Sequence, residues 1–183
     1  MRKIRLYIAM SLNGKIARPD GSVDWLEAIP NPDKTDYGYA AFYEEIDTTI
    51  QGYNTYQQLL SWGIPFPYSG KTNYVLTRKK DVENTEEVIF VKEDPIKFIQ
   101  EIKQQEGKDI WLIGGGEINT LLLNAGLIDE LELFIMPIIL PEGIDLFGGI
   151  PEETSLRLLK TKTFSSGAAR ITYDIIPSAQ RIK

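Results

Sequence analysis

The chain has 183 residues, of which 43% are hydrophobic and 25% charged, and it carries a net charge of −6 at pH 7. These values are ordinary for a globular protein with one core, so we expect a single domain over residues 1–183, and the excess of acidic residues argues against a nucleic acid as partner. The sequence has no cysteine and no histidine, which excludes disulfides, thiolate nucleophiles, histidine–zinc sites and any mechanism built on a histidine base.

Apolar runs and helical periodicities alternate along the chain from its beginning. Strands are predicted where apolar residues are continuous or alternate with polar ones, and helices where they recur at helical spacing. The predicted strands are residues 3–12, 47–52, 72–77, 87–91, 109–114 and 129–140. The predicted helices are residues 39–46, 54–60, 95–106 and 117–125, and an antiparallel pair that turns at residues 165–167 closes the chain over residues 156–177.

Capping residues support two of these helices. Asp94 is placed to cap the third helix, with Pro95 at its first position and Gly107 after its end. Asn54 or Thr55 is placed to cap the second helix. Helices and strands that alternate before a closing hairpin indicate an α/β protein with a mostly parallel sheet and antiparallel edges.

The longest apolar runs, such as residues 133–140, are far shorter than the ~20 residues of a membrane-spanning helix. The apolar part of residues 1–9 is too brief for a signal peptide. We therefore expect a cytoplasmic location, no membrane partner and no metal site. Any chemistry must use carboxylates, hydroxyls, lysine, backbone amides or a cofactor.

Three consecutive glycines, Gly114, Gly115 and Gly116, separate a buried strand from a helix that begins near Glu117. The first amides of a helix have no internal partner, and glycines let a phosphate approach them closely, so this arrangement predicts an anion site. A tight turn with no ligand is the alternative. The Rossmann fingerprint fails because Asn119 stands at its last glycine, and a P-loop fails because Pro65 stands at its first.

Six segments occur in the order expected of one family: IAMSLNGKIA, GSVDWL, TIQGYNTYQQL, YVLTRK, WLIGGGEINTLLL and LIDELELFIMPIILPEGIDLF. The chain resembles the dihydrofolate reductase-like superfamily, and within it the branch of the C-terminal reductase domain of riboflavin biosynthesis. The resemblance covers about residues 3–175. It implies a three-layer α/β/α fold with a central mixed, mostly parallel sheet and a C-terminal antiparallel hairpin. It also implies NADPH as hydride donor, a small-molecule substrate and a homodimer.

The resemblance assigns site residues by position. Ala9 and Ile16 would flank the nicotinamide. The diphosphate would lie along Gly52, Tyr53, Asn54 and Thr55 on one side and Gly114, Gly115, Gly116, Glu117 and Ile118 on the other, with a cis peptide bond between Gly114 and Gly115. Thr77 and Arg78 would approach the adenosine. From their residue types alone, Ala9 and Ile16 are better interpreted as core residues, and the basic run that begins at Arg78 is more often a solvated turn than an anion site.

The substrate end departs from the family pattern. Relatives commonly carry arginine where this chain has Tyr53, so preference for NADPH would depend on Arg78. Asn13 replaces a carboxylate and, with Trp25, is a candidate substrate contact, although Trp25 could equally anchor its loop.

Folate reductases place an acid at a position that falls here on Gly38. Asp36 is the nearest candidate proton donor, and Glu27 is a more distant one that could equally be a surface residue. We therefore expect an NADPH-dependent reductase that resembles the 5-amino-6-(5-phosphoribosylamino)uracil reductase of riboflavin biosynthesis. Its substrate would be a small heterocyclic or pterin-like compound. A true dihydrofolate reductase, or a nucleotide-binding protein without turnover, are the alternatives.

Overall fold

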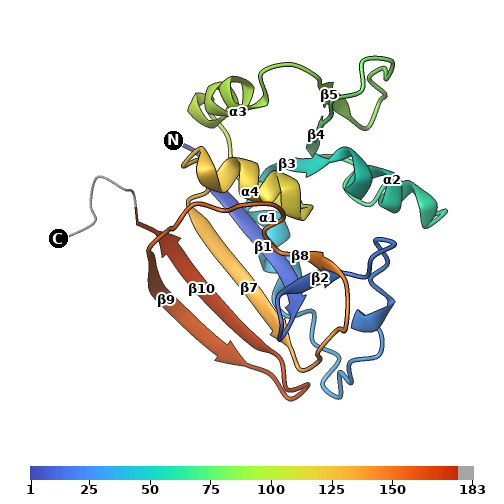
Figure 1. Ribbon diagram of the computed structural model, residues 1–183, viewed down its shortest axis with the longest axis vertical. Helices are drawn as coiled ribbons and strands as arrows, with labels where there is room; N and C mark the ends of the chain where they lie inside the picture. Colours follow the sequence, from blue (N-terminus) through green and yellow to red (C-terminus); the bar gives the residue numbers. More distant parts are fainter. Residues whose placement is uncertain (177–183) are drawn as a thin grey trace.

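An eight-stranded sheet forms the centre of the fold, in the order β5-β4-β3-β6-β1-β7-β10-β9 (Figure 1). The computed structural model describes residues 1–176; the predicted end of the hairpin at Pro177 lies outside them. The strands of this sheet are β1 Ile4–Ser11, β3 Ile46–Gly52, β4 Thr72–Leu76, β5 Ile89–Val91, β6 Asp109–Gly114, β7 Glu130–Met136, β9 Leu156–Thr163 and β10 Ala169–Ile175. The remaining elements are a small sheet of β2 Lys15–Ala17 and β8 Ile144–Asp145, the helices α1 Tyr39–Glu44, α2 Tyr53–Ser61, α3 Pro95–Gln104 and α4 Gly116–Asn124, and a 3₁₀ turn at Asp24–Leu26.

The strands from β5 to β7 are parallel, and the closing hairpin adds β10 and β9 in antiparallel orientation. The predicted mixed, mostly parallel sheet with a C-terminal hairpin is therefore confirmed. The expectation of antiparallel strands at both edges is wrong, because β5 pairs in parallel with β4. A crossover helix before a strand produces a parallel pair, whereas the short turn between β9 and β10 produces an antiparallel one.

Helices cover both faces of the parallel part of the sheet (Figure 1). On one face, Ile99 and Ile102 of α3 and Leu122 of α4 pack with Leu112 of β6 in the largest core cluster. On the other face, Phe42 of α1 and Leu59 of α2 pack with Trp111, the neighbour of Leu112 on β6. Because successive side chains of a strand point to opposite faces, these two clusters define the three-layer α/β/α arrangement.

One of the two predicted helix caps is confirmed and the other is wrong. Asp94 caps α3, since its side chain accepts a hydrogen bond from the amide of Lys97, and Pro95 is the first helical residue as predicted. The cap predicted at Asn54 or Thr55 is wrong: α2 starts at Tyr53, directly after β3, and its cap position is Gly52. The first amides of α2 therefore have no side-chain cap at the end of the sheet.

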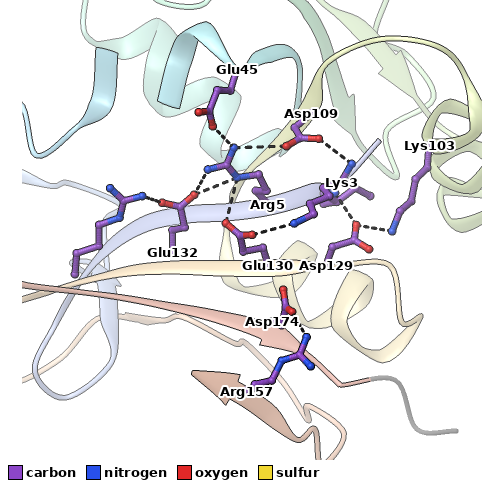
Figure 2. A network of polar contacts seen from close by, with 12 residues as sticks. Lys3, Arg5, Glu45, Lys103, Asp109, Asp129, Glu130, Glu132, Arg157 and Asp174 are labelled. Carbon is purple, nitrogen blue, oxygen red and sulfur yellow. Dashed lines mark hydrogen bonds and ion pairs between the residues drawn. The ribbon is translucent and has the colours of Figure 1, made fainter. Parts of the chain in front are cut away.

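A network of acidic and basic side chains joins β1, β6 and β7 to Glu45 at the end of α1 (Figure 2). Arg5 of β1 binds Glu132 of β7, whose side chain is fully buried, and also lies 2.5 Å from Glu45 and 3.5 Å from Asp109. The alternation predicted for β7 holds. On its glutamate face, Glu132 is fully buried and Glu130 is partly buried, because helices cover both faces of a parallel sheet.

Candidate active site

A cleft of about 1970 Å³ opens at the carboxyl ends of β3, β4, β5 and β6. Pockets for drug-sized ligands measure roughly 300–1,000 Å³, so this cleft has room for a dinucleotide. Its walls are the loop at residues 19–27, the first turns of α2 and α4, the ends of β4 and β5, and residues 144, 148 and 149. Ligands of open α/β sheets bind at this end of the strands.

Two helices begin side by side in this cleft, each after a glycine that provides no side-chain cap. The glycines are Gly52 before α2 and Gly115 before α4. A Cβ added to Gly52 would lie 2.9 Å from Ile118 of α4, and one added to Gly115 would lie 3.5 Å from Thr55 Oγ1 of α2. Two sets of free amides and two positive dipole ends therefore meet at one place, an arrangement that favours a multiply charged anion.

The three glycines of residues 114–116 have three separate functions. Gly114 has φ +115°, which side chains rarely adopt, and its peptide bond to Gly115 is cis, as predicted. Gly116 packs so tightly that an added Cβ would overlap the carbonyl oxygen of Asp145. Gly115 has an ordinary φ of −80° and lines the cleft. Gly115 is therefore the glycine of the three whose backbone is open to the close approach of a ligand.

Basic residues line the cleft at the ends of β4 and β5. Arg78 and Lys79 follow β4, and Lys92 follows β5. The Arg78 side chain is 97% exposed and lies 3.7 Å from Glu117, which is also exposed. Lys79 Nζ lies 4.7 Å from the centre of the Tyr53 ring. The Tyr53 ring thus holds a lysine beside the cleft.

The cleft brings together most of the cofactor residues assigned by resemblance. The predicted residues that line it are Glu27, Tyr53, Asn54, Thr55, Thr77, Arg78, Gly115, Gly116, Glu117 and Ile118. The predicted residues outside its lining are Ala9, Asn13, Ile16, Trp25, Asp36, Gly52 and Gly114. Ile16 belongs to the main core cluster, and Ala9 packs at the edge of a second cluster.

The predicted stacking role of Trp25 is wrong. Its side chain is 1% exposed and packs against Phe134 and Met136, so it anchors its loop to the sheet. Asn13 also has a structural function. Its side-chain amide donates to the Leu140 carbonyl at 2.7 Å, and its oxygen accepts from the Leu140 amide at 3.1 Å.

The two predicted acids differ in position. Asp36 accepts hydrogen bonds from the amides of Ala40 and Gly38 at the start of α1, and these bonds lower its pKa. A carboxyl with a lowered pKa is ionised at neutral pH and is a poor proton donor. Glu27 is exposed at the rim of the cleft.

Sequence patterns did not indicate two further residues of the cleft. Gln58 of α2 donates a hydrogen bond to the Gly21 carbonyl, which joins the loop to the helix across the opening. Gly148 donates its amide to the Gly116 carbonyl at 3.0 Å and holds the start of α4. The pair Gly148–Gly149 could have indicated a close backbone contact, whereas no sequence pattern marks Gln58.

The comparisons agree with this architecture. The sequence model of the RibD C-terminal domain matches residues 66–169. The uncharacterized protein YwjB of Bacillus subtilis is 41% identical over 89% of this chain and 92% of that protein. The uncharacterized protein YyaP of the same organism is 33% identical over 94% of each. A solved Shewanella sp. PV-4 structure, named for riboflavin biosynthesis, has a TM-score of 0.84 and 31% identity over 97% of this chain and all of that one.

Dihydrofolate reductase from Enterococcus faecalis, solved in complex with NADP(H) and RAB-propyl, has a TM-score of 0.66 at 17% identity. That match covers 96% of this chain and 97% of that one, and it shows that the two share a fold.

Proposed function

This chain belongs to the RibD C-terminal domain family, and on that premise we propose that it is an NADPH-dependent oxidoreductase. It would reduce a small heterocyclic or pterin-like substrate, as the uracil reductase of riboflavin biosynthesis does. The observation that carries the proposal is the meeting of the two uncapped helix starts, at Gly52 and Gly115, inside a cleft of dinucleotide size.

The residues at these helix starts fit a diphosphate. Gly115 leaves the amides of α4 accessible, and the hydroxyl of Thr55 lies beside it. The buried hydroxyl of Thr120, which lines the same cleft, has no hydrogen-bond partner in the described part of the chain. Buried polar atoms are normally paired, so this hydroxyl supports a polar ligand in the cleft.

The basic residues at the far end support the phosphorylated form of the dinucleotide. Arg78, Lys79 and Lys92 all line the cleft where the adenosine would lie. A guanidinium can hold a phosphate with two hydrogen bonds, and the nearby lysines add positive charge. Glu117 lies 3.7 Å from Arg78 and opposes an extra anion, so we expect the preference for NADPH over NADH to be modest.

When bound, the nicotinamide supplies a hydride; the chain binds, orients and shields the reactants. The loop at residues 19–27 forms one wall of the cleft, and the hydrogen bond from Gln58 to Gly21 draws it toward α2. This contact would hold water away from the reacting end. Dihydrofolate reductase activity is less well supported, because Asp36 is turned into the α1 cap and Gly38 offers no acid.

A titration of the purified protein with NADPH tests the proposal. In Gly115→Val, the added methyls should obstruct the helix amides and weaken binding by about tenfold or more, the value of one lost hydrogen bond to a charged group. Gly126→Ala, at a turn far from the cleft lining, is the control for a general effect of losing a glycine. A folded Gly115→Val protein that binds NADPH like the parent would contradict the diphosphate assignment.

We also propose that the protein is a homodimer. The hairpin strand β9 exposes Leu156, Leu158 and Leu159 at 40%, 56% and 46%. Clustered exposed leucines on a sheet edge indicate a contact surface. Light scattering at micromolar concentration should give twice the chain mass, and Leu158→Glu should shift the protein toward the monomer. A monomer mass for the parent would refute the dimer.

A further inference from the structure

A group of hydrogen-bond donors lies on the α1 face of the sheet, around the ring of Phe134. The Tyr7 ring is 4.7 Å from Phe134 and 6.4 Å from the ring of Tyr39, and the Tyr37 ring is 6.3 Å from Phe134. The guanidinium carbon of Arg170, on β10, is 5.6 Å from the Phe134 centre. Three phenols and one guanidinium from three separate elements and a loop therefore share one location.

These donors lack partners within residues 1–176. Arg170 uses Nη2 to bind Glu132, but its Nε is buried without a partner and no hydrogen bond involves its Nη1. No hydrogen bond involves the hydroxyls of Tyr7, Tyr37 or Tyr39 in the same part of the chain. A buried donor without a partner is costly, so the Nε of Arg170 favours an acceptor that comes from outside the chain. The half-buried Tyr7 and Tyr37 and the exposed Tyr39 keep their hydroxyls open to such an acceptor.

The acidic groups nearby are already engaged. Glu132 is shared between Arg5 and Arg170, and Asp36 accepts two α1 amides. Lys162 adds positive charge and stands over Phe164, 4.9 Å from its centre. Burial raises the pKa of Tyr7 and outweighs the opposing effect of Arg170, so the phenol keeps its proton and remains a donor. The cluster therefore favours ligands with negative charge or oxygen acceptors.

The backbone beside the cluster is strained. Tyr37 has φ +57° and Lys34 has φ +49°, which are uncommon for residues other than glycine. The strained turn holds the Tyr37 ring between Phe134 and Phe164. Strain of this kind is retained where the surrounding structure enforces it, often at ligand sites.

The cluster adjoins the wall of the cleft through Leu26. Leu26 lines the cleft and packs in the same apolar cluster as Tyr7, Ala9 and Phe134. Ala9 and Tyr7 are two residues apart on β1, so their side chains point to the same face about 6.6 Å apart along the strand. The resemblance expects the nicotinamide beside Ala9, which puts this cluster where a substrate would lie.

We propose that Arg170, Tyr7 and Tyr39 form the substrate-recognition site and select a planar ring that carries an oxyanion. The exposed ring of Tyr39 would contact a face of the ligand ring, and the guanidinium and phenols would donate to its oxygens. A protonated amidine-type ring would face the Arg170 guanidinium and be repelled. This inference rests on the proposed function, since it assigns the substrate end of the same active site.

Calorimetric titration with two probes in the absence of cofactor tests the proposal. Orotate is a planar ring with a carboxylate, and 2,4-diaminopyrimidine is a planar ring that becomes cationic. We expect orotate to bind and diaminopyrimidine not to bind. Tyr7→Phe keeps the ring stacking and Arg170→Lys keeps the charge beside Glu132, and each should weaken orotate binding by about tenfold or more. Tyr74→Phe, on the opposite face beside Phe98, is the matched control and should bind like the parent.

Three results would overturn the proposal: no orotate binding by the parent, equal binding by Tyr7→Phe and Arg170→Lys, or tighter binding of diaminopyrimidine. Each variant is also titrated with NADPH to separate this site from the cleft. Unchanged NADPH binding together with lost orotate binding supports the proposal. If the parent binds orotate but not NADPH, the cofactor assignment fails while the recognition site stands.

Discussion

Glu132 is the residue whose neutralisation should destabilise the fold most. Its side chain is fully buried, and its two oxygens accept from Arg5 and Arg170. Burial alone would lower the pKa of Arg5, but hydrogen bonds to Glu45 and Glu132 outweigh burial and raise it. The guanidinium of Arg5 therefore depends on this carboxylate for part of its stabilisation (Figure 2).

The substitution Glu132→Gln keeps the volume and one acceptor oxygen but removes the charge. Removal of one member of a buried ion pair costs about 3–5 kcal/mol. Arg5 retains Glu45 and Asp109, so we expect a value near the lower end, about 3 kcal/mol. For a chain of this size, 1 kcal/mol shifts Tm by about 2–4 °C, so Tm should fall by about 6–12 °C.

Thermal and urea unfolding, followed by circular dichroism, measure this loss. The control is Asp174→Asn, which breaks the pair with Arg157 at 2.5 Å on the hairpin. Because 67% of the Arg157 side chain is exposed, that loss should stay below about 1 kcal/mol. If Glu132→Gln were no more destabilising than Asp174→Asn, the buried network would have no stabilising function and the reasoning would be refuted.

The site gives four further predictions. Gly116→Ala should cost about 1–3 kcal/mol, because its Cβ would overlap the Asp145 carbonyl, whereas Gly115→Ala should unfold like the parent; equal stability of the two variants in urea would contradict the packing argument. Arg78→Ala should reduce the preference for NADPH over NADH by about tenfold, and unchanged discrimination would show that selectivity lies elsewhere. Amide hydrogen bonds lower the pKa of Asp36 below its ordinary 3.8, so its contribution to stability is present above that pH and is lost as the pH falls through the folded-state pKa. In Asp36→Asn, the free energy of unfolding should therefore fall less between neutral and acidic pH than it does in the parent. The parent should turn over dihydrofolate poorly between about pH 5 and pH 8, and efficient turnover that Asp36→Asn abolishes would make Asp36 the missing acid.

The sequence determined the order and type of most elements. Residues 109–114 were predicted as a buried strand and form β6 with the same bounds, because a strand buried on both faces is apolar throughout. Pro95 and Asp94 marked the start of α3 because their preferences are local. The short strands β2 and β8 were missed, since neither is stable except by pairing with the other across the chain.

The glycine run at residues 114–116 also predicted a ligand contact from the sequence alone. Gly114, Gly115 and Gly116 indicated a close approach between backbone and ligand, and the resemblance supplied the cis bond before the structure was described. Gly115 and Gly116 both line the cleft, but the sequence could not say which of them has room for a side chain. That depends on Asp145, about thirty residues away, whose carbonyl occupies the space beside Gly116.

Only the tertiary structure showed which polar and aromatic residues have structural roles. The residues next to Trp25 in the sequence are compatible both with stacking on a substrate and with anchoring a loop. Its burial against Phe134 shows that it anchors the loop. Glu132 looks like the solvated face of a strand until Arg5 is found opposite it on β1. Contacts of this kind join residues more than a hundred positions apart. Local propensity carries no information about them, because their energies depend on burial and on a partner that the fold alone brings near.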